Sequence, residues 1–120
     1  MRKWRARGGY QQKSPGAVVS DHAVVRWLQR VEGMDLEKVR AEAKIVTGEG
    51  PVTDQEFLGY LQAYHRLNVA TIRQKIATDW VLSLIAAGVR YIPLHNRRVW
   101  LRVMGGVITT VVIRDHQRTA

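Results

Sequence analysis

Three side chains that could bind a phosphate ester and move a proton lie four residues apart in the sequence. His22, Arg26 and Arg30 fall on one stripe of an α-helix at this spacing. An imidazole exchanges a proton near neutral pH, and a guanidinium binds two phosphate oxygens at once. His22 would lie in the first helical turn, where free backbone N–H groups attract anions, and we expect no carboxylate on this face. The alternative interpretation is the ordinary polar face of an amphipathic helix.

A second set of candidate residues alternates along a predicted strand at 98–104. Arg98, Trp100 and Arg102 share one face of this strand, and the residues between them are apolar. An indole can stack on a nucleobase while the flanking guanidiniums bind phosphates. The pattern therefore favours a nucleic-acid contact, although an exposed edge strand protected by its charges would have the same sequence.

The charge of the chain is concentrated at its two ends. The net charge is +9 over 120 residues, and residues 20–87 are close to neutral. Residues 1–18 are predicted to be a flexible basic arm, and residues 88–120 are basic as well. A neutral body between basic ends favours a polyanionic partner, most simply nucleic acid, although the arm could be a solubilising tail. The candidate binding residues of the arm are Arg2, Lys3, Arg5 and Arg7.

Several kinds of chemistry have no support in the sequence. The chain contains no cysteine, so neither a disulfide scaffold nor a thiolate metal site is expected. No cluster of His, Asp and Glu has the spacing of metal ligands, and no glycine-rich phosphate or dinucleotide motif occurs. We therefore expect no metal and no cofactor. No apolar run has the length of a membrane span or a signal peptide, so the sequence predicts a cytoplasmic protein without a membrane contact.

Residues 19–43 align without gaps on residues 52–76, 33 positions later in the chain. The repeated pattern predicts two helix–turn–helix pairs, at 19–48 and 52–88, produced by an internal duplication. His22, Arg26 and Arg30 are not repeated, because Gln55, Gly59 and Ala63 take their places, and this favours the first copy as the site of chemistry. The identical pairs are Val19/Val52, Asp21/Asp54, Leu28/Leu61, Gln29/Gln62 and Arg40/Arg73.

Capping residues define the expected helices, and alternating residues define the strands. Ser20, Asp35, Thr53 and Asn68 are predicted helix N-caps, and the helix after Asn68 is expected to run to Gly88. The remaining residues predict a three-stranded antiparallel meander at 89–114, with a hairpin turn at Gly105-Gly106. Residues 107–113 are nearly all β-formers, so we expect this strand to be central. The fold class is therefore α+β, with one domain at 19–120.

Two segments, 20–30 (SDHAVVRWLQR) and 105–111 (GGVITTV), resemble the barnase, EndoU, colicin and RelE-like ribonuclease superfamily. The resemblance implies a helical part before an antiparallel sheet and metal-independent cleavage of RNA by its own 2′-OH. It also implies that His22 is the acid–base group, that Arg26 stabilises the transition state, and that Thr110 positions the phosphate. Arg30 and Arg102 would then orient the RNA backbone.

These observations leave three hypotheses. The first is a small RNA-directed protein, a metal-independent, toxin-like or phage-encoded ribonuclease. The alternative is a non-catalytic phage-type protein that binds nucleic acid, or inhibits a nucleic-acid enzyme, through its basic ends. A helix–turn–helix DNA reader is disfavoured by the neutral middle, since recognition helices are normally basic. RNA is favoured over DNA, and a protein partner such as an antitoxin, or a second copy of the chain, is compatible with an exposed edge strand.

Overall fold

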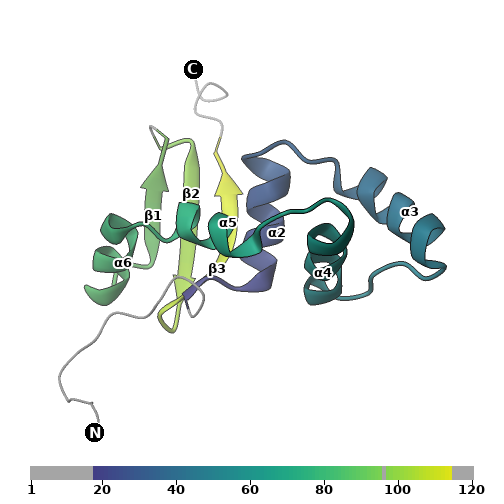
Figure 1. Ribbon diagram of the computed structural model, residues 1–120. Helices are drawn as coiled ribbons and strands as arrows, with labels where there is room; N and C mark the ends of the chain where they lie inside the picture. The colour runs from purple at the N-terminus through teal and green to yellow at the C-terminus, as the bar shows by residue number, and fades with distance from the viewer. Residues whose placement is uncertain (1–17, 96, 115–120) are drawn as a thin grey trace, which may run out of the picture.

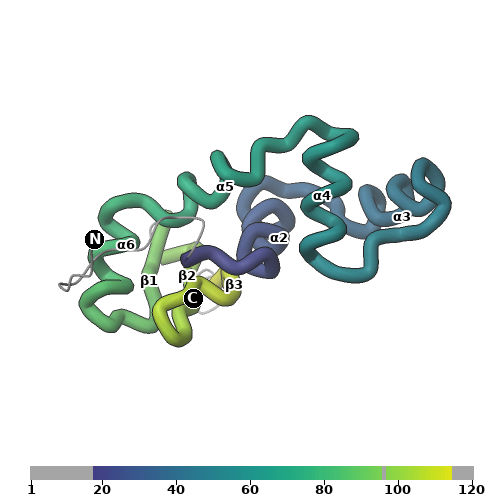
Figure 2. Tube along the Cα trace, turned by 60° about the horizontal axis from the view of Figure 1, so that its bottom comes forward, coloured from purple at the N-terminus to yellow at the C-terminus, as the bar shows by residue number. Residues whose placement is uncertain are grey.

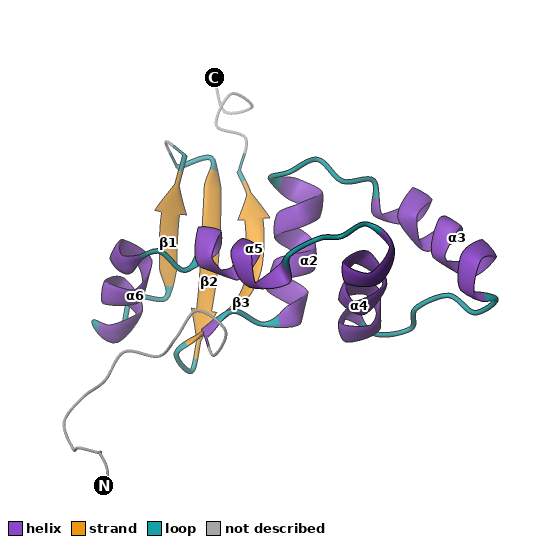
Figure 3. Cartoon of the chain, viewed as in Figure 1, coloured by secondary structure: helices purple, strands orange, loops and turns teal. Residues whose placement is uncertain are grey.

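The computed structural model describes residues 18–95 and 97–114, in which five helices precede a three-stranded antiparallel sheet. The predicted α+β fold class is confirmed (Figures 1 and 3). The predicted arm residues Arg2, Lys3, Arg5 and Arg7 lie outside the described residues. The elements are α2 (Asp21–Arg30), α3 (Leu36–Thr47), α4 (Asp54–Tyr64), α5 (Val69–Ile76), α6 (Asp79–Ala86), β1 (Tyr91–Leu94), β2 (Val99–Met104) and β3 (Val107–Ile113).

Each helix begins at a side chain that accepts a hydrogen bond from a backbone N–H of the first turn. The four predicted N-caps Ser20, Asp35, Thr53 and Asn68 all act in this way. Thr53 also forms a capping box, because the Glu56 carboxylate accepts from the Thr53 backbone N–H. These local signals depend on neighbouring residues only, so the sequence was sufficient to place four of the five described helix starts.

The prediction of one long helix from Asn68 to Gly88 is wrong. The chain leaves the helical conformation at Ala77, with φ −97° and ψ 69°, and α6 begins after a new cap at Thr78. The Thr78 hydroxyl accepts from Val81 N, which offers the backbone an alternative to continuing the helix. Trp80, the second residue of α6, is 53% exposed.

The expectation that residues 107–113 form the central strand is also wrong. The strand order is β1-β2-β3, so β2 lies in the middle. The free edge of β3 lies along α2 and its N-cap instead: Ser20 N donates to Ile108 O at 3.1 Å, and Arg30 Nη1 donates to Val111 O at 2.6 Å. Val19 adds a single parallel bridge to Ile108. The outer edge of β3 is therefore covered by a helix and not by a further strand of the sheet, although its residues are nearly all β-formers.

The core lies between the helices and one face of the sheet. Ile92, Leu101, Ile108 and Val111 are fully buried on this inner face. Figures 1 and 2 both place α5 on one side of the strands. Val18, expected at the end of the arm, is 1% exposed and belongs to this core.

The two helix pairs contact each other through matched residues of the repeat. Asp21 of the first pair forms an ion pair with Arg73 of the second, and Asp54 of the second forms one with Arg40 of the first. This exchange is reciprocal, as in a contact with approximate twofold symmetry. Buried positions match as well, since Leu28 and its counterpart Leu61 are both fully buried. The duplication itself stays a prediction.

Candidate nucleic-acid interface

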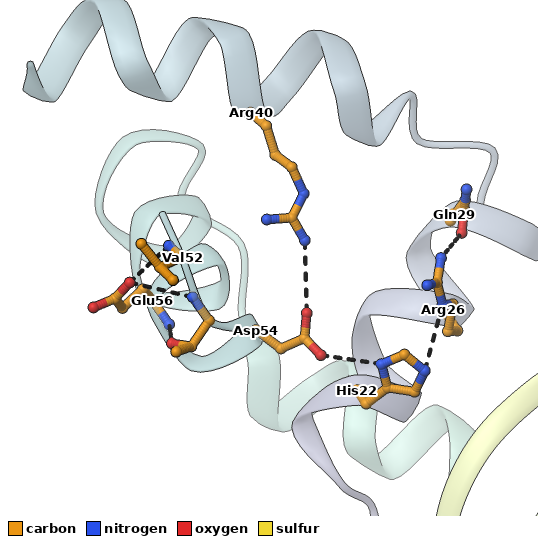
Figure 4. A network of polar contacts seen from close by, with 8 residues as sticks. His22, Arg26, Gln29, Arg40, Val52, Asp54 and Glu56 are labelled. Atoms are coloured by element: carbon orange, nitrogen blue, oxygen red, sulfur yellow. Dashed lines mark hydrogen bonds and ion pairs between the residues drawn. The ribbon is translucent and has the colours of Figure 1, made fainter. Parts of the chain in front are cut away.

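The His22 imidazole lies between a carboxylate of α4 and a guanidinium of its own helix (Figure 4). Its Nδ1 is 3.1 Å from the Asp54 Oδ2 atom, and Asp54 Oδ1 is 3.6 Å from Arg40 Nη2. The expectation that no carboxylate faces the stripe is therefore wrong. Asp54 is the first residue of α4, and the contact between the helix pairs brings it to the first turn of α2.

Arg26 lies on the other side of the imidazole, as the spacing of four residues predicts. Its Nε donates to His22 Nε2 at 3.4 Å, and its Nη1 donates to Gln29 Oε1 at 2.6 Å. This arrangement fits a neutral imidazole that carries its proton on Nδ1 and directs it to Asp54. The His22 side chain is 46% exposed, so a ligand can reach it from solvent. A carboxylate-oriented imidazole with an accepting Nε2 is the arrangement that general base catalysis uses.

The structure does not bring Thr110 to this pair. Thr110 lies opposite Arg102 in the β2–β3 ladder, on the outer face of the sheet. Within residues 18–95 and 97–114, no hydrogen bond joins Thr110 to His22 or Arg26. Arg30, the third member of the stripe, uses its guanidinium on the Val111 carbonyl and so supports the edge of β3. The residues that the resemblance groups into one site thus lie in two places.

The second candidate set lies on the outer face of the sheet. The expected alternation is confirmed, because Val99, Leu101 and Val103 are buried whereas Arg102 is exposed and Trp100 is half-buried. Arg98 falls one residue before β2 and is exposed.

Trp100 is held in place by two contacts on this face. Its Nε1 donates to the Arg97 carbonyl at 2.7 Å, and the Arg114 guanidinium lies 5.3 Å from the centre of its ring. Such a distance is typical of a cation–π interaction. Arg114 was not among the predicted site residues. Its position after β3 places it in register with Arg98, whose carbonyl accepts from Arg114 N at 2.8 Å.

The outer face carries Arg98, Arg102 and Arg114, and the residues around it are basic as well. Residues 89–114 contain five arginines and no Asp or Glu. Arg90, Arg98, Arg102 and Arg114 make no ion pair with any carboxylate of the described residues, whereas the ion pairs that are present join side chains of the helical part. A face of this kind attracts phosphates without first having to release a carboxylate.

Two further findings concern ligands and membranes. Among residues 18–95 and 97–114, no three His, Asp or Glu side chains come together as metal ligands. None of the described helices has the length and apolar character needed to cross a membrane.

Comparisons of the chain with models of known protein families, with curated proteins and with solved structures gave no match. The resemblance of residues 20–30 and 105–111 to the ribonuclease superfamily therefore stays a prediction.

Proposed function

We propose that this protein binds single-stranded nucleic acid, RNA in the first place, on the outer face of its sheet, and that it does so in the cytoplasm. The observation that carries the proposal is Trp100, an indole flanked by Arg102 and Arg114 on a basic face that no described helix covers. The preference for RNA depends on the resemblance stated above.

The physical basis is stacking combined with charge. A base stacked on an aromatic side chain contributes about 1–3 kcal/mol, and this contribution depends little on which base it is. Tyr91, the neighbour of Arg102 on β1, is 52% exposed and offers a second ring. The arginines between and beside these rings supply the phosphate contacts that set affinity and its dependence on salt. The face therefore suits an unpaired strand better than a duplex.

Fluorescence anisotropy with labelled single-stranded RNA and DNA tests the proposal. Trp100→Ala should weaken binding by about 5- to 150-fold, which corresponds to one lost stacking contact. Trp80→Ala is the matched control, because Trp80 is also half exposed but lies on α6. Equal losses in both variants, or none in Trp100→Ala, would show that the outer face is not the binding surface.

A metal-independent ribonuclease is the second candidate, favoured by the chain of contacts Asp54–His22–Arg26. In this reaction His22 Nε2 would accept the proton of the ribose 2′-OH while that oxygen attacks the adjacent phosphorus. The P–O5′ bond would then break, and the imidazolium would return its proton to the departing 5′ oxygen. Arg26 would turn from Nε2 toward the phosphate and balance the charge of the transition state.

Incubation of labelled RNA with the protein in EDTA tests this second candidate. His22→Ala should lower the cleavage rate by about 10²- to 10⁴-fold without lowering the melting temperature. His65→Ala serves as the control, because His65 also pairs with a carboxylate, that of Glu42, but lies outside the stripe. Cleavage that survives in His22→Ala removes this histidine from the mechanism, and RNA left intact by the wild-type protein leaves binding as the function.

A further inference from the structure

A hollow of about 440 Å³ opens at the hairpin end of the sheet, where α6 leads into β1. It adjoins the outer face, since Arg102 belongs to both. Its volume lies within the range of small-molecule sites, about 300–1,000 Å³. The hollow is therefore large enough for one ligand of nucleotide size.

Part of the wall of this hollow is apolar, and one of its residues is aromatic. Ile85, Val89 and Val103 contribute aliphatic groups, all of them partly or fully buried. Tyr91 and Met104 also line it, and they are 52% and 57% exposed. A flat ring can thus pack on apolar surface while an aromatic side chain stands beside it.

The charged residues among the described lining are two arginines, Arg90 and Arg102. Neither forms an ion pair with a described carboxylate, and none of the residues described around the hollow is an Asp or a Glu. The Arg90 carbonyl accepts from Val103 N at 2.8 Å, which ties the backbone of Arg90 to β2. The register of the β2–β3 ladder shifts between Arg102 and Val103, and such bulges commonly redirect side chains next to binding sites.

The hairpin turn leaves space for an anion near these arginines. Gly105 and Gly106 both have positive φ, at 59° and 78°, and both line the hollow. A Cβ atom built on Gly105 would meet nothing within 4 Å, so the backbone there is open to an approaching group. Backbone N–H groups in such turns often assist phosphate binding.

We propose that this hollow binds one phosphorylated nucleoside, with its base against Tyr91 and Met104 and its phosphate on Arg90 and Arg102. If the nucleotide is part of the bound strand, this proposal extends the proposed function and rests on it. The same chemistry describes a free mononucleotide and the phosphorylated end of an oligonucleotide, so the experiment includes both.

Calorimetric titration with AMP, UMP, adenosine and inorganic phosphate tests the site. The two mononucleotides should bind more tightly than adenosine or phosphate, and Arg90→Gln should weaken them by about 10- to 150-fold, as expected for a lost charged hydrogen bond. Arg66→Gln is the control, because Arg66 is exposed in the loop between α4 and α5. If Arg90→Gln does not fold, Arg90→Lys is used, which keeps the charge but loses the bidentate geometry.

Each outcome decides the proposal. Wild-type protein that binds AMP no better than phosphate, or Arg90→Gln that binds AMP as wild type does, overturns it. The hollow binds the end of a strand if the protein prefers 5′-phosphorylated over unphosphorylated oligonucleotides and Arg90→Gln loses this preference. It binds a free nucleotide if the protein binds AMP without such a preference. Trp100→Ala should keep AMP binding while losing the oligonucleotide, so failure of the hollow and failure of the outer face are separate results.

Discussion

Tyr60 is the residue whose acid–base chemistry the fold changes most clearly. It is buried on α4, and its hydroxyl donates to the Glu42 carboxylate of α3. Burial, and then the hydrogen bond to Glu42, raise the pKa of Tyr60 to about 12. The pKa of Glu42 is lowered in turn, by the hydrogen bond from Tyr60 first and then by that from His65. The pair therefore favours a neutral phenol beside an ionised carboxylate.

This pKa predicts a loss of stability at high pH. An unfolded tyrosine releases its proton near pH 10, whereas Tyr60 in the folded protein keeps it until about pH 12. The free energy of unfolding should therefore fall as pH rises from 10 to 12. Urea unfolding at several pH values in this range measures the effect, and absorbance at 295 nm follows the phenol directly. Tyr60→Phe should lack both the late absorbance step and this part of the pH dependence; a slope unchanged in that variant would contradict the assignment.

The sequence predicted those parts of the candidate sites that depend on spacing within one element. Four residues in a helix bring Arg26 to His22, and two residues in a strand bring Arg102 to the same face as Trp100. It could not predict the Asp54 contact, because Asp54 lies 32 residues away and reaches His22 through helix packing. Arg114 was missed for the same reason, since its approach to Trp100 depends on strand register.

At the scale of elements, local capping predicted four of the five described helix starts, and the fifth was missed because two local signals compete. Thr78 was available in the sequence as a cap, but the apolar periodicity on both sides of it favoured one continuous helix. The place of β3 in the sheet depended on what covers its edge. Ser20 and Arg30 of the first helix pair do this, and no local pattern in residues 107–113 reveals it.

The reciprocal ion pairs of the two helix pairs allow a comparison of matched arginines. Arg73 is largely buried, at 17% side-chain exposure, and donates to both the Val19 carbonyl and Asp21. Arg40 is 35% exposed, lies 3.6 Å from Asp54, and covers the Phe57 ring at 4.4 Å. The matched positions thus differ in burial and in the number of acceptors.

Arg73→Ala should lower the free energy of unfolding by about 2–3 kcal/mol, because it leaves a backbone carbonyl and a carboxylate without their donor. Arg40→Ala should cost about 1 kcal/mol, the sum expected for a partly exposed ion pair and a weak cation–π contact with the buried Phe57 ring. Urea unfolding of both variants measures the difference. Equal losses would show that the difference in burial and in acceptors between the two arginines does not affect stability.

At the scale of the whole molecule, opposite charges occupy different parts of the fold. Residues 31–64, which form α3, α4 and the adjoining loops, contain seven carboxylates against three lysines and arginines. Residues 89–114, which form the sheet and its turns, contain five arginines and no carboxylate. Figures 1 and 2 place α3 and the sheet on opposite sides of α2. If the proposed partner is a nucleic acid, this charge distribution would attract it to the sheet and repel it from the far helices, and so would orient the molecule as the two approach.

This separation predicts which arginines control the salt dependence of binding. Each phosphate contact to a single strand releases counterions and adds about 0.7 to the slope of log K against log salt concentration. Arg102→Gln should therefore make that slope less steep by about 0.7, the value of one phosphate contact. Lys44→Gln on α3 should leave the slope unchanged, or slightly strengthen the repulsion of the strand. Anisotropy titrations at several salt concentrations give the slopes. An equal decrease in both variants would mean that binding follows the net charge of +9 as a whole, and that the outer face has no special part in it.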